Sequence, residues 1–350
     1  MAGVLIDNSV LIDDEKEGSR IYNRGYYGTP QSGGGLKLNL LETLYLLESG
    51  RIEVEREGKE IGFGDILEYT SANIPSFEIY YTVYRDMRQR GYIVKEGSPP
   101  FDFRVLPRGG SPTKTPTKYW LAAFSERAVF DLDNVIKLTR RAEELRKKLL
   151  IAIVDEEGDL TYYESGMARP KGKSVPHPDI EAVGYLSEDR VAVLEDEHIA
   201  ALTEKGFFGK SVGPYLQLSL IESTYLMEQG VCTVRRFSTG RKVSLKSMIT
   251  LAKRIQPDFS TRMEVYRDLK ERGLITKTGF KYGTHFRAYE GDPERHHARY
   301  LVHCFEPDYR GLWPEMSRAV RLAHGVRKEI LFARAGEDGI EYLKLMRKRP

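Results

Sequence analysis

The sequence has few cysteines, no long hydrophobic run and little net charge. Its 350 residues include 2 cysteines, Cys232 and Cys304, too far apart to form a Cys-x-x-Cys pair, which argues against a structural zinc site or a disulfide framework. No apolar run approaches the ~20 residues that a bilayer-spanning helix needs. The segment from Met1 to Asp14 acquires acidic residues where a signal peptide has Lys or Arg. We therefore expect a cytoplasmic protein with no membrane partner.

The small net charge conceals an uneven distribution. The chain has 54 Lys+Arg against 51 Asp+Glu, a formal charge of +3, and 41% of its residues are hydrophobic. This composition is typical of a globular protein, and the length predicts about two domains. Residues 281–350 alone hold 14 Lys+Arg against 10 Asp+Glu. The basic excess of this segment is therefore larger than that of the whole chain.

An internal repeat dominates the sequence. The sequence GYYG at residues 25–28 returns as GFFG at 206–209, an offset of 181 (206 − 25), and LLETLYLLESG at 40–50 returns as LIESTYLMEQG at 220–230, an offset of 180 (220 − 40). Further matches at offsets of 182 and 183 pair YRDMRQRG with YRDLKERG and FDFRVL with THFRAY. An offset that drifts by only three residues indicates a tandem duplication with small insertions in loops.

The repeat defines the expected domains and fold class. Residues 164–180 contain three prolines and no apolar period, which predicts a linker between a degenerate, structural repeat at 1–163 and a second repeat at 181–350. In each repeat we expect an N-terminal α/β subdomain followed by a small mixed-sheet, nuclease-like subdomain, an α+β or α/β fold overall. The pattern predicts helices from the N-caps Asn39 and Ser219, second helices at about 76–90 and 260–272, and β-hairpins at Gly158 and Gly339.

Residues found in only one repeat are candidates for chemistry, because the fold does not require them. Histidine is suited to proton transfer near neutral pH, and five of the seven histidines lie at 285–324 in the second repeat. A metal site is the competing interpretation, but no Cys or carboxylate spacing completes a familiar set of ligands. Aligning the two copies pairs three polar residues of the second with residues of the first: Tyr289 with Leu106, His297 with Pro116, and Lys328 with Lys147.

Three motifs in the second repeat resemble a known family. The run GFKYGTHFRAYEG at 279–291, then HARYLV from His297, then RLAHGVRK ending at Lys328 resemble the catalytic domain of the archaeal tRNA-splicing endonucleases. The two-repeat arrangement resembles the homodimeric branch of that family. The resemblance implies a catalytic triad of Tyr289, His297 and Lys328 within residues 281–350. His296 is a rival to His297, which is preferred because it keeps the family's three-residue step to Tyr300.

The resemblance also implies a mechanism without metal or cofactor. The RNA 2′-hydroxyl is the nucleophile, Tyr289 the general base, His297 the general acid and Lys328 the group that stabilises the phosphorane, although the roles of Tyr289 and His297 could be exchanged. The expected products carry 2′,3′-cyclic phosphate and 5′-hydroxyl ends. The expected substrate is precursor tRNA with a bulge–helix–bulge at its intron boundaries, gripped by two arginines that match Arg321 and, more weakly, Arg347.

The family resemblance further implies a dimer. In the family, an acidic loop of the degenerate repeat docks into a basic groove of the other subunit. Asp155, Glu156, Glu157 and Asp159 fit that loop in composition and position, while the competing interpretation is a solvated charged turn. Two further alternatives stay open for the whole chain: a non-catalytic RNA-binding or structural subunit, and a metal-dependent DNA nuclease.

Overall fold

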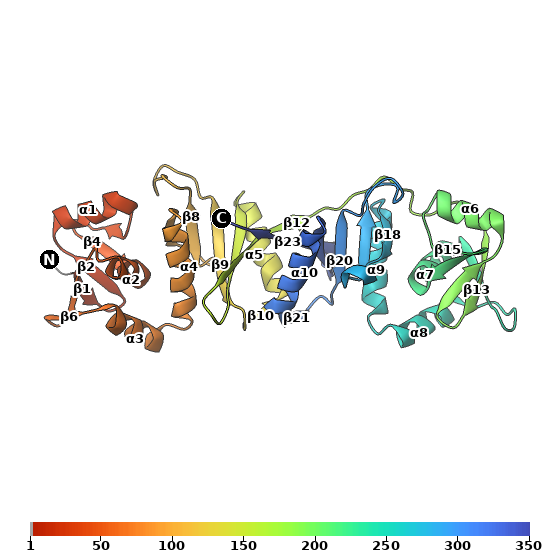
Figure 1. Cartoon of the computed structure of the whole chain (residues 1–350), viewed down its shortest axis with the longest axis horizontal. Helices are drawn as coiled ribbons and strands as arrows, with labels where there is room; N and C mark the ends of the chain where they lie inside the picture. The colour runs from red at the N-terminus through yellow and green to blue at the C-terminus, as the bar shows by residue number, and fades with distance from the viewer. Residues whose placement is uncertain (1–2) are drawn as a thin grey trace. The chain divides into compact units, whose positions relative to one another are not determined.

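A computed structural model describes residues 3–350 and confirms a mixed α/β protein with a repeated order of elements (Figure 1). Two compact units are present. The first contains residues up to Val129, Lys137–Ser165 and the terminal Lys348–Pro350, and the second contains Phe130–Ile136 and Gly166–Arg347. No helix in the described part of the chain has the length and apolar character needed to cross a bilayer.

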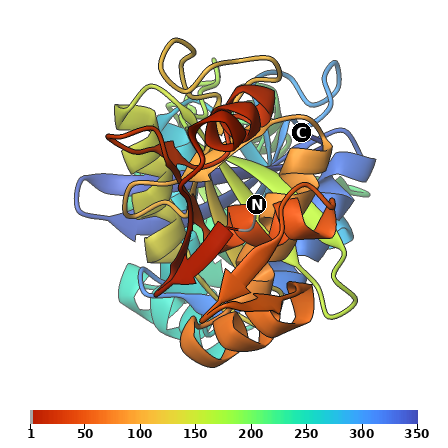
Figure 2. The same ribbon diagram turned by 90° about the vertical axis from the view of Figure 1, so that its left-hand side faces the viewer.

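Each repeat opens with an α/β subdomain. The first has strands in the order β3-β4-β2-β1-β5-β6, drawn in red and orange with its helices in Figure 2. The second has the order β15-β16-β14-β13-β17, so the central strands correspond. The elements of the first subdomain are β1 (Gly3–Ile6), β2 (Ser9–Ile12), α1 (Glu15–Gly25), β3 (Thr29–Pro30), β4 (Leu36–Asn39), α2 (Leu40–Glu48), β5 (Val54–Arg56), β6 (Lys59–Ile61) and α3 (Phe63–Asn73). Those of the second are β13 (Ala182–Ser187), β14 (Arg190–Val193), α6 (Asp196–Glu204), β15 (Lys210–Val212), β16 (Tyr215–Ser219), α7 (Leu220–Glu228), β17 (Cys232–Arg236) and α8 (Leu245–Ile255).

The second subdomain of each repeat is a mixed sheet covered by helices. Its strands follow the order β7-β8-β9-β11-β12 in the first repeat and β18-β19-β20-β22-β23 in the second. The elements of the first are α4 (Phe77–Gln89), β7 (Ile93–Glu96), β8 (Phe103–Leu106), β9 (Tyr119–Ser125), β10 (Val129–Asp131), α5 (Leu132–Glu144), β11 (Lys148–Val154) and β12 (Leu160–Ala168). Those of the second are α9 (Phe259–Glu271), β18 (Ile275–Thr278), the 3₁₀ turn η1 (Phe280–Tyr282), β19 (Phe286–Tyr289), β20 (Tyr300–Cys304), β21 (Arg310–Leu312), α10 (Trp313–Gly325), β22 (Glu329–Gly336) and β23 (Gly339–Lys348).

The predicted N-caps form in both repeats. Asn39 and Ser219 each accept a hydrogen bond from the backbone N–H of a glutamate three residues on, and that glutamate accepts one from the backbone N–H of the cap, which makes a capping box at the start of α2 and of α7. After both helices a glycine takes positive φ, 62° at Gly50 and 73° at Gly230, as helix ends commonly require. The helix boundaries predicted here are confirmed to within two residues.

The same polar contact joins the two subdomains of each repeat. Lys95 of β7 donates to the carbonyl of Gly28 at 2.8 Å and to Glu42 of α2 at 2.9 Å. Lys277 of β18 donates to the carbonyl of Gly209 at 2.7 Å, and its Nζ lies 3.7 Å from Glu222 of α7. The capping-box glutamate thus also holds the following sheet, a second reason for this residue type at both positions.

The predicted linker and the unit boundary differ in part from the structure. Glu164–Ala168 was expected to belong to the linker but continues strand β12, paired with β11 from Leu149↔Ser165 onward. Phe130–Ile136 belongs to the second unit, because Phe130 packs edge-on against Trp313 with ring centroids 4.9 Å apart. The first difference concerns how far a hairpin strand extends, and the second arises from a contact between residues that lie far apart in the sequence.

Two half-buried histidines of the second repeat predict a pH-dependent stability. Burial lowers the pKa of His285 and of His303 to about 4. His285 Nδ1 accepts a 2.8 Å hydrogen bond from the Cys304 N–H, and His303 stacks on Phe305 and Phe332. Their pKa is lower in the folded than in the unfolded protein, so the stability they contribute is present above pH ~6.5 and is lost as the pH falls towards 4.

Replacing His303 with phenylalanine is expected to make the thermal midpoint less sensitive to pH between 7 and 5. The aromatic stack is kept while one of the two proton-binding groups is removed, so the loss on acidification should shrink by on the order of 1 kcal/mol. Calorimetry at pH 7 and pH 5 measures this. An equal drop in the two proteins would contradict the assignment of the effect to His303.

Candidate active site

Tyr289 is held at the carboxyl end of β19. It pairs with Ile275 of β18, as Leu106 pairs with Ile93 in the first repeat, so the two positions correspond in three dimensions as they do in sequence. The residue is 7% exposed. The guanidinium carbon of Arg287, on the same strand, lies 5.7 Å from the centre of the tyrosine ring. A phenol with a cation beside it is thereby fixed at one end of the sheet.

His297 lies in the loop that leads into β20. The loop turns at Asp292, whose carbonyl accepts the backbone N–H of Arg295 at 3.2 Å and of His296 at 2.9 Å. Both His296 and His297 are exposed. The next residue, Ala298, is buried in the same hydrophobic cluster as Tyr289. His297 therefore precedes the alanine that shares a cluster with Tyr289, whereas His296 lies one residue earlier, in the turn.

Lys328 meets the same point from a third strand. It lies between α10 and β22, immediately before the first residue of that strand, and its Nζ donates a 3.0 Å hydrogen bond to the carbonyl of Ala298. The same Nζ lies 5.8 Å from the centre of the Tyr282 ring. Ala298 thus shares a hydrophobic cluster with Tyr289, accepts the Lys328 hydrogen bond and is the residue after His297. The three predicted catalytic residues lie on or beside β19, β20 and β22, which are neighbours in the sheet.

Charged residues around this point were not predicted from the sequence. Arg299 is paired with Glu290 at 2.8 Å and with Glu329 at 3.1 Å, which ties the strand ends together. Tyr300 donates a 2.9 Å hydrogen bond to Glu290. Burial and this bond raise the pKa of Tyr300 to about 12. Tyr300 therefore holds its proton more firmly than an ordinary tyrosine, which disfavours it as a general base.

Two of these residues, Glu290 and Glu329, differ in type between the two repeats. Glu290 corresponds to Pro107 and Glu329 to Lys148, so acidic side chains stand here only in the second copy. Although burial opposes it, hydrogen bonds from Lys344 and Arg299 hold the pKa of Glu329 below its usual range. The predicted triad of tyrosine, histidine and lysine did not include these two carboxylates. Arg299 corresponds to Lys118, which is also a cation, so a comparison of the two repeats does not single it out.

The other predicted functional residues lie outside this cluster. Arg321 is exposed on α10 and Arg347 is exposed on β23. Asp155, Glu156, Glu157 and Asp159 form the turn between β11 and β12 in the first unit. Among residues 3–350, no group of three His, Cys, Asp or Glu side chains is arranged to hold a metal ion. Both cysteines are buried and free.

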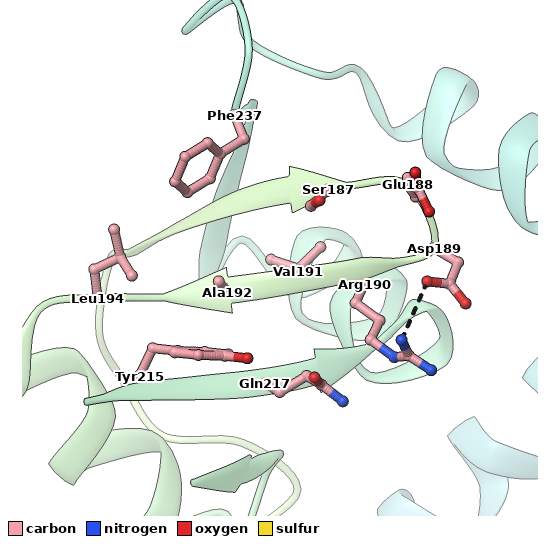
Figure 3. Close-up of a pocket in the computed structure, with 10 residues that line it drawn as sticks. All are labelled: Ser187, Glu188, Asp189, Arg190, Val191, Ala192, Leu194, Tyr215, Gln217 and Phe237. Carbon is pink, nitrogen blue, oxygen red and sulfur yellow. Dashed lines mark ion pairs between the residues drawn. The ribbon is translucent and has the colours of Figure 1, made fainter. Parts of the chain in front are cut away.

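A pocket of about 420 Å³ lies away from the proposed catalytic residues. It is formed by β13, β14, β16 and the chain just after β17, with Leu194, Tyr215 and Phe237 around it (Figure 3). The ion pair between Asp189 and Arg190, 3.7 Å apart, stands at its edge. None of the residues implied by the family resemblance lines it.

Comparison with protein families identifies both halves of each repeat. The family described as tRNA intron endonuclease, N-terminal domain, matches residues 1–67 and 182–249. The family described as tRNA intron endonuclease, catalytic C-terminal domain, matches residues 77–162 and 259–342. Fold, site and matched domains together define a tandem duplication of a two-domain endonuclease.

Similar proteins extend over the whole chain. A tRNA-splicing endonuclease of Methanococcoides burtonii is 41% identical over 353 residues, covering 99% of each chain. That of Methanosarcina acetivorans is 40% identical over 334 residues, covering 94% of each, and that of Natronomonas pharaonis is 34% identical over 365 residues, covering 100% of each. The chain belongs to the tRNA intron endonuclease family, as a tRNA-splicing endonuclease with two copies of the N-terminal domain and two of the catalytic domain.

Proposed function

We propose that the chain excises introns from precursor tRNA by metal-independent transesterification at bulge–helix–bulge sites. The observation that carries the proposal is the convergence of Tyr289 and Lys328 on Ala298, next to His297. The first repeat has Leu106 in place of the tyrosine. The second repeat thus has a tyrosine and a histidine for proton transfer where the first has Leu106 and Pro116, although the first repeat keeps a lysine, Lys147, at the position of Lys328.

In the proposed reaction, each side chain moves or stabilises one charge. Tyr289 takes the proton of the 2′-hydroxyl as its oxygen attacks the adjacent phosphorus, and Lys328 stabilises the negative charge on the phosphorane. The bond from phosphorus to the 5′-oxygen then breaks, and His297 gives that oxygen a proton. The products are a 2′,3′-cyclic phosphate and a 5′-hydroxyl. The exposure of His297 suits the acid role, because solvent can reprotonate it after each turnover.

Removing the nucleophile tests this chemistry without altering the protein. A precursor tRNA with a 2′-deoxynucleotide immediately 5′ of one cleavage site should be cut only at its unmodified site, since the deoxy sugar has no attacking oxygen. Cleavage at the modified site would contradict the proposal, because a nuclease that activates water does not need the 2′-hydroxyl.

The proposed active form is a homodimer. A substrate with two bulges needs two active sites, and each chain has one candidate site, a requirement that closed twofold symmetry satisfies. The turn between β11 and β12 is the proposed contact with the partner. Its shape is set by Asp155, whose carboxylate accepts the backbone N–H of Glu157 at 3.0 Å and of Asp159 at 2.8 Å. The carboxylates of Glu156 and Glu157 are exposed, which supports a role in an intermolecular contact.

Arg321 is proposed to stack on an unpaired bulge base, with Arg347 as the second arginine. Arg321→Ala is expected to lower cleavage of bulge-containing RNA by about 2- to 30-fold, because a cation–π contact is worth ~0.5–2 kcal/mol. Affinity for an uninterrupted duplex should not change. Arg318 is located one turn earlier on α10 and provides the matched control, Arg318→Ala, in the same assays. Equal losses of affinity for bulged and uninterrupted RNA would instead make Arg321 a phosphate contact.

A further inference from the structure

The N-terminal subdomain of the second repeat contains a segment with basic residues and no acidic ones. Residues 235–255, the hairpin after β17 together with α8, hold 7 Lys+Arg and no Asp or Glu. The matching segment of the first repeat, residues 55–73, holds 2 Lys+Arg and 5 Asp+Glu. The seven cations of this surface, called the basic hairpin surface below, are Arg235, Arg236, Arg241, Lys242, Lys246, Lys253 and Arg254.

The difference is a reversal of charge at corresponding positions. In the first repeat, Glu55 pairs with Glu60 across the hairpin that follows the buried Val54. In the second repeat, Arg235 bridges Lys242 immediately after the equivalent buried residue, Val234. Two facing glutamates in one copy are thus two facing cations in the other. Because both copies make an antiparallel pairing at this point, the fold does not require either sign.

The hairpin holds its cations in a fixed array. The Arg236 N–H donates to the Arg241 carbonyl at 2.8 Å, and the Arg236 carbonyl accepts the Gly240 N–H at 2.8 Å. The Phe237 N–H donates to the carbonyl of Leu186 in β13 at 3.0 Å, and the ring of Phe237 packs edge-on against Tyr185. Phe237 itself is 61% exposed and marks the start of the hairpin turn in Figure 3. A rigid hairpin presents its charges with little ordering cost on binding.

These charges are not neutralised within the chain. All seven cations are exposed, and within residues 3–350 none of them makes an ion pair. The side chain of Arg235 donates only to a backbone group of the hairpin, the carbonyl of Gly240, at 3.2 Å. Like charges in such proximity repel one another unless a polyanion lies against them, and the counterions of that polyanion are released when it binds.

We propose that the basic hairpin surface binds the phosphate backbone of precursor tRNA, as an anchoring site separate from the catalytic residues around Ala298. The inference rests on the proposed function, since that function supplies the polyanion. The corresponding acidic surface of the first repeat repels RNA, so each chain anchors RNA on its catalytic half only. Contacts of this kind are insensitive to sequence and sensitive to salt.

A charge swap that copies the first repeat tests the proposal. The double variant Arg235→Glu/Lys242→Glu is compared with the wild type and with Glu55→Gln/Glu60→Gln, a matched change on the other hairpin. Binding is measured with a full precursor tRNA that contains 2′-deoxynucleotides at both cleavage sites, so that no turnover occurs, from 50 to 300 mM salt. The expected result is about tenfold weaker binding at 0.1 M salt and a slope of log Kd against log salt reduced by about 2, one for each phosphate that is no longer neutralised. The matched control, which removes negative charge from the first-repeat hairpin, should bind at least as tightly as the wild type.

The kcat, the thermal midpoint and the oligomeric state of the variant show whether a change in RNA binding has another cause. The kcat at saturating substrate should not change, and the thermal midpoint should stay near that of the wild type because the replaced side chains are exposed. An unchanged salt slope overturns the proposal. A slope that changes only because the variant no longer dimerises, as seen by light scattering, also overturns it and makes the surface a protein contact. If the wild type fails to cleave unmodified precursor tRNA, the proposed function fails, independently of this result.

Discussion

Replacing His297 with alanine is expected to slow cleavage of precursor tRNA by about a hundredfold to ten-thousandfold, with no change in RNA affinity. This is the usual contribution of one proton-transfer group, and because the imidazole is exposed, its removal should leave the packing of the site intact. Single-turnover rates at saturating enzyme measure the effect on chemistry, and Kd for an uncleavable precursor measures binding. Equal losses in rate and affinity would contradict a catalytic role.

The neighbouring histidine is the matched control for this experiment. His296→Ala removes an exposed imidazole from the same loop and is expected to keep the rate within about threefold of the wild type. A large loss for His296→Ala together with a small one for His297→Ala would reverse the assignment. The sequence alone left these two residues as rivals. The contacts of Ala298 with Tyr289 and Lys328 favour the residue adjacent to Ala298.

A modified leaving group separates the acid from the base. A substrate with sulfur in place of the bridging 5′-oxygen has a leaving group that departs without a proton. If His297 is the general acid, His297→Ala should cleave this substrate nearly as fast as the wild type does, while Tyr289→Phe should stay slow. Rescue of Tyr289→Phe instead would exchange the two roles.

Reversing two charges in the acidic turn is expected to give inactive monomers that still fold. In Glu156→Lys/Glu157→Lys, the turn keeps its shape because Asp155 holds the backbone. The change breaks an exposed ion pair between Glu156 and Arg127, at 2.6 Å, and such pairs add little stability. Loss of a docking charge typically costs ~2–5 kcal/mol, so activity at micromolar protein should fall by about a hundredfold. Sedimentation and cleavage assays measure the two effects.

The second repeat supplies the matched control for the acidic turn. Glu337 and Asp338 occupy the corresponding turn between β22 and β23. The variant Glu337→Lys/Asp338→Lys makes the same change in charge and should stay dimeric and active. An active dimer of Glu156→Lys/Glu157→Lys would contradict the docking role, and monomers of both variants would show that the effect is general rather than specific to the first repeat.

Local signals in the sequence predicted much of the fold. Asn39 and Ser219 are followed three residues later by Glu42 and Glu222, so the capping boxes were readable from a four-residue window. Because the chain is duplicated, the same capping-box pattern occurs in both repeats and forms in both. The extension of β12 to Ala168 was missed because the turn at Gly158 does not fix how long the hairpin strand is. The membership of Phe130 in the second unit was missed because it depends on Trp313, a partner distant in the sequence.

Part of the candidate site could likewise be predicted from the sequence, and part depends on the three-dimensional structure. Tyr289 and His297 were predicted from the difference between the repeats and from the family resemblance, and Lys328 from the resemblance alone, since Lys147 corresponds to it. Both signals depend on residue type. The carbonyl of Ala298, which accepts the Lys328 hydrogen bond, belongs to the backbone and has no sequence signature. The link from Arg299 to Glu290 and Glu329 joins three segments, and only the pairing of β19, β20 and β22 shows that they meet.

The basic hairpin surface changes the meaning of the small net charge. The chain's formal charge of +3 is smaller than the charge of +7 on residues 235–255 alone. Acidic segments of the first repeat and basic segments of the second nearly cancel in the total. For a protein proposed to bind RNA with one repeat and its own partner chain with the other, the distribution of charge is the informative quantity.

The central claim is that this chain cuts RNA with its own side chains and the RNA's own 2′-hydroxyl. The most direct measurement is cleavage of a bulge-containing precursor tRNA by the purified protein in excess EDTA, with spermidine to keep the RNA folded, followed by analysis of the new ends. The account predicts full cleavage, with 2′,3′-cyclic phosphate on one side and 5′-hydroxyl on the other. Absence of cleavage until a divalent metal is restored, or products with 5′-phosphate and 3′-hydroxyl ends, would contradict it.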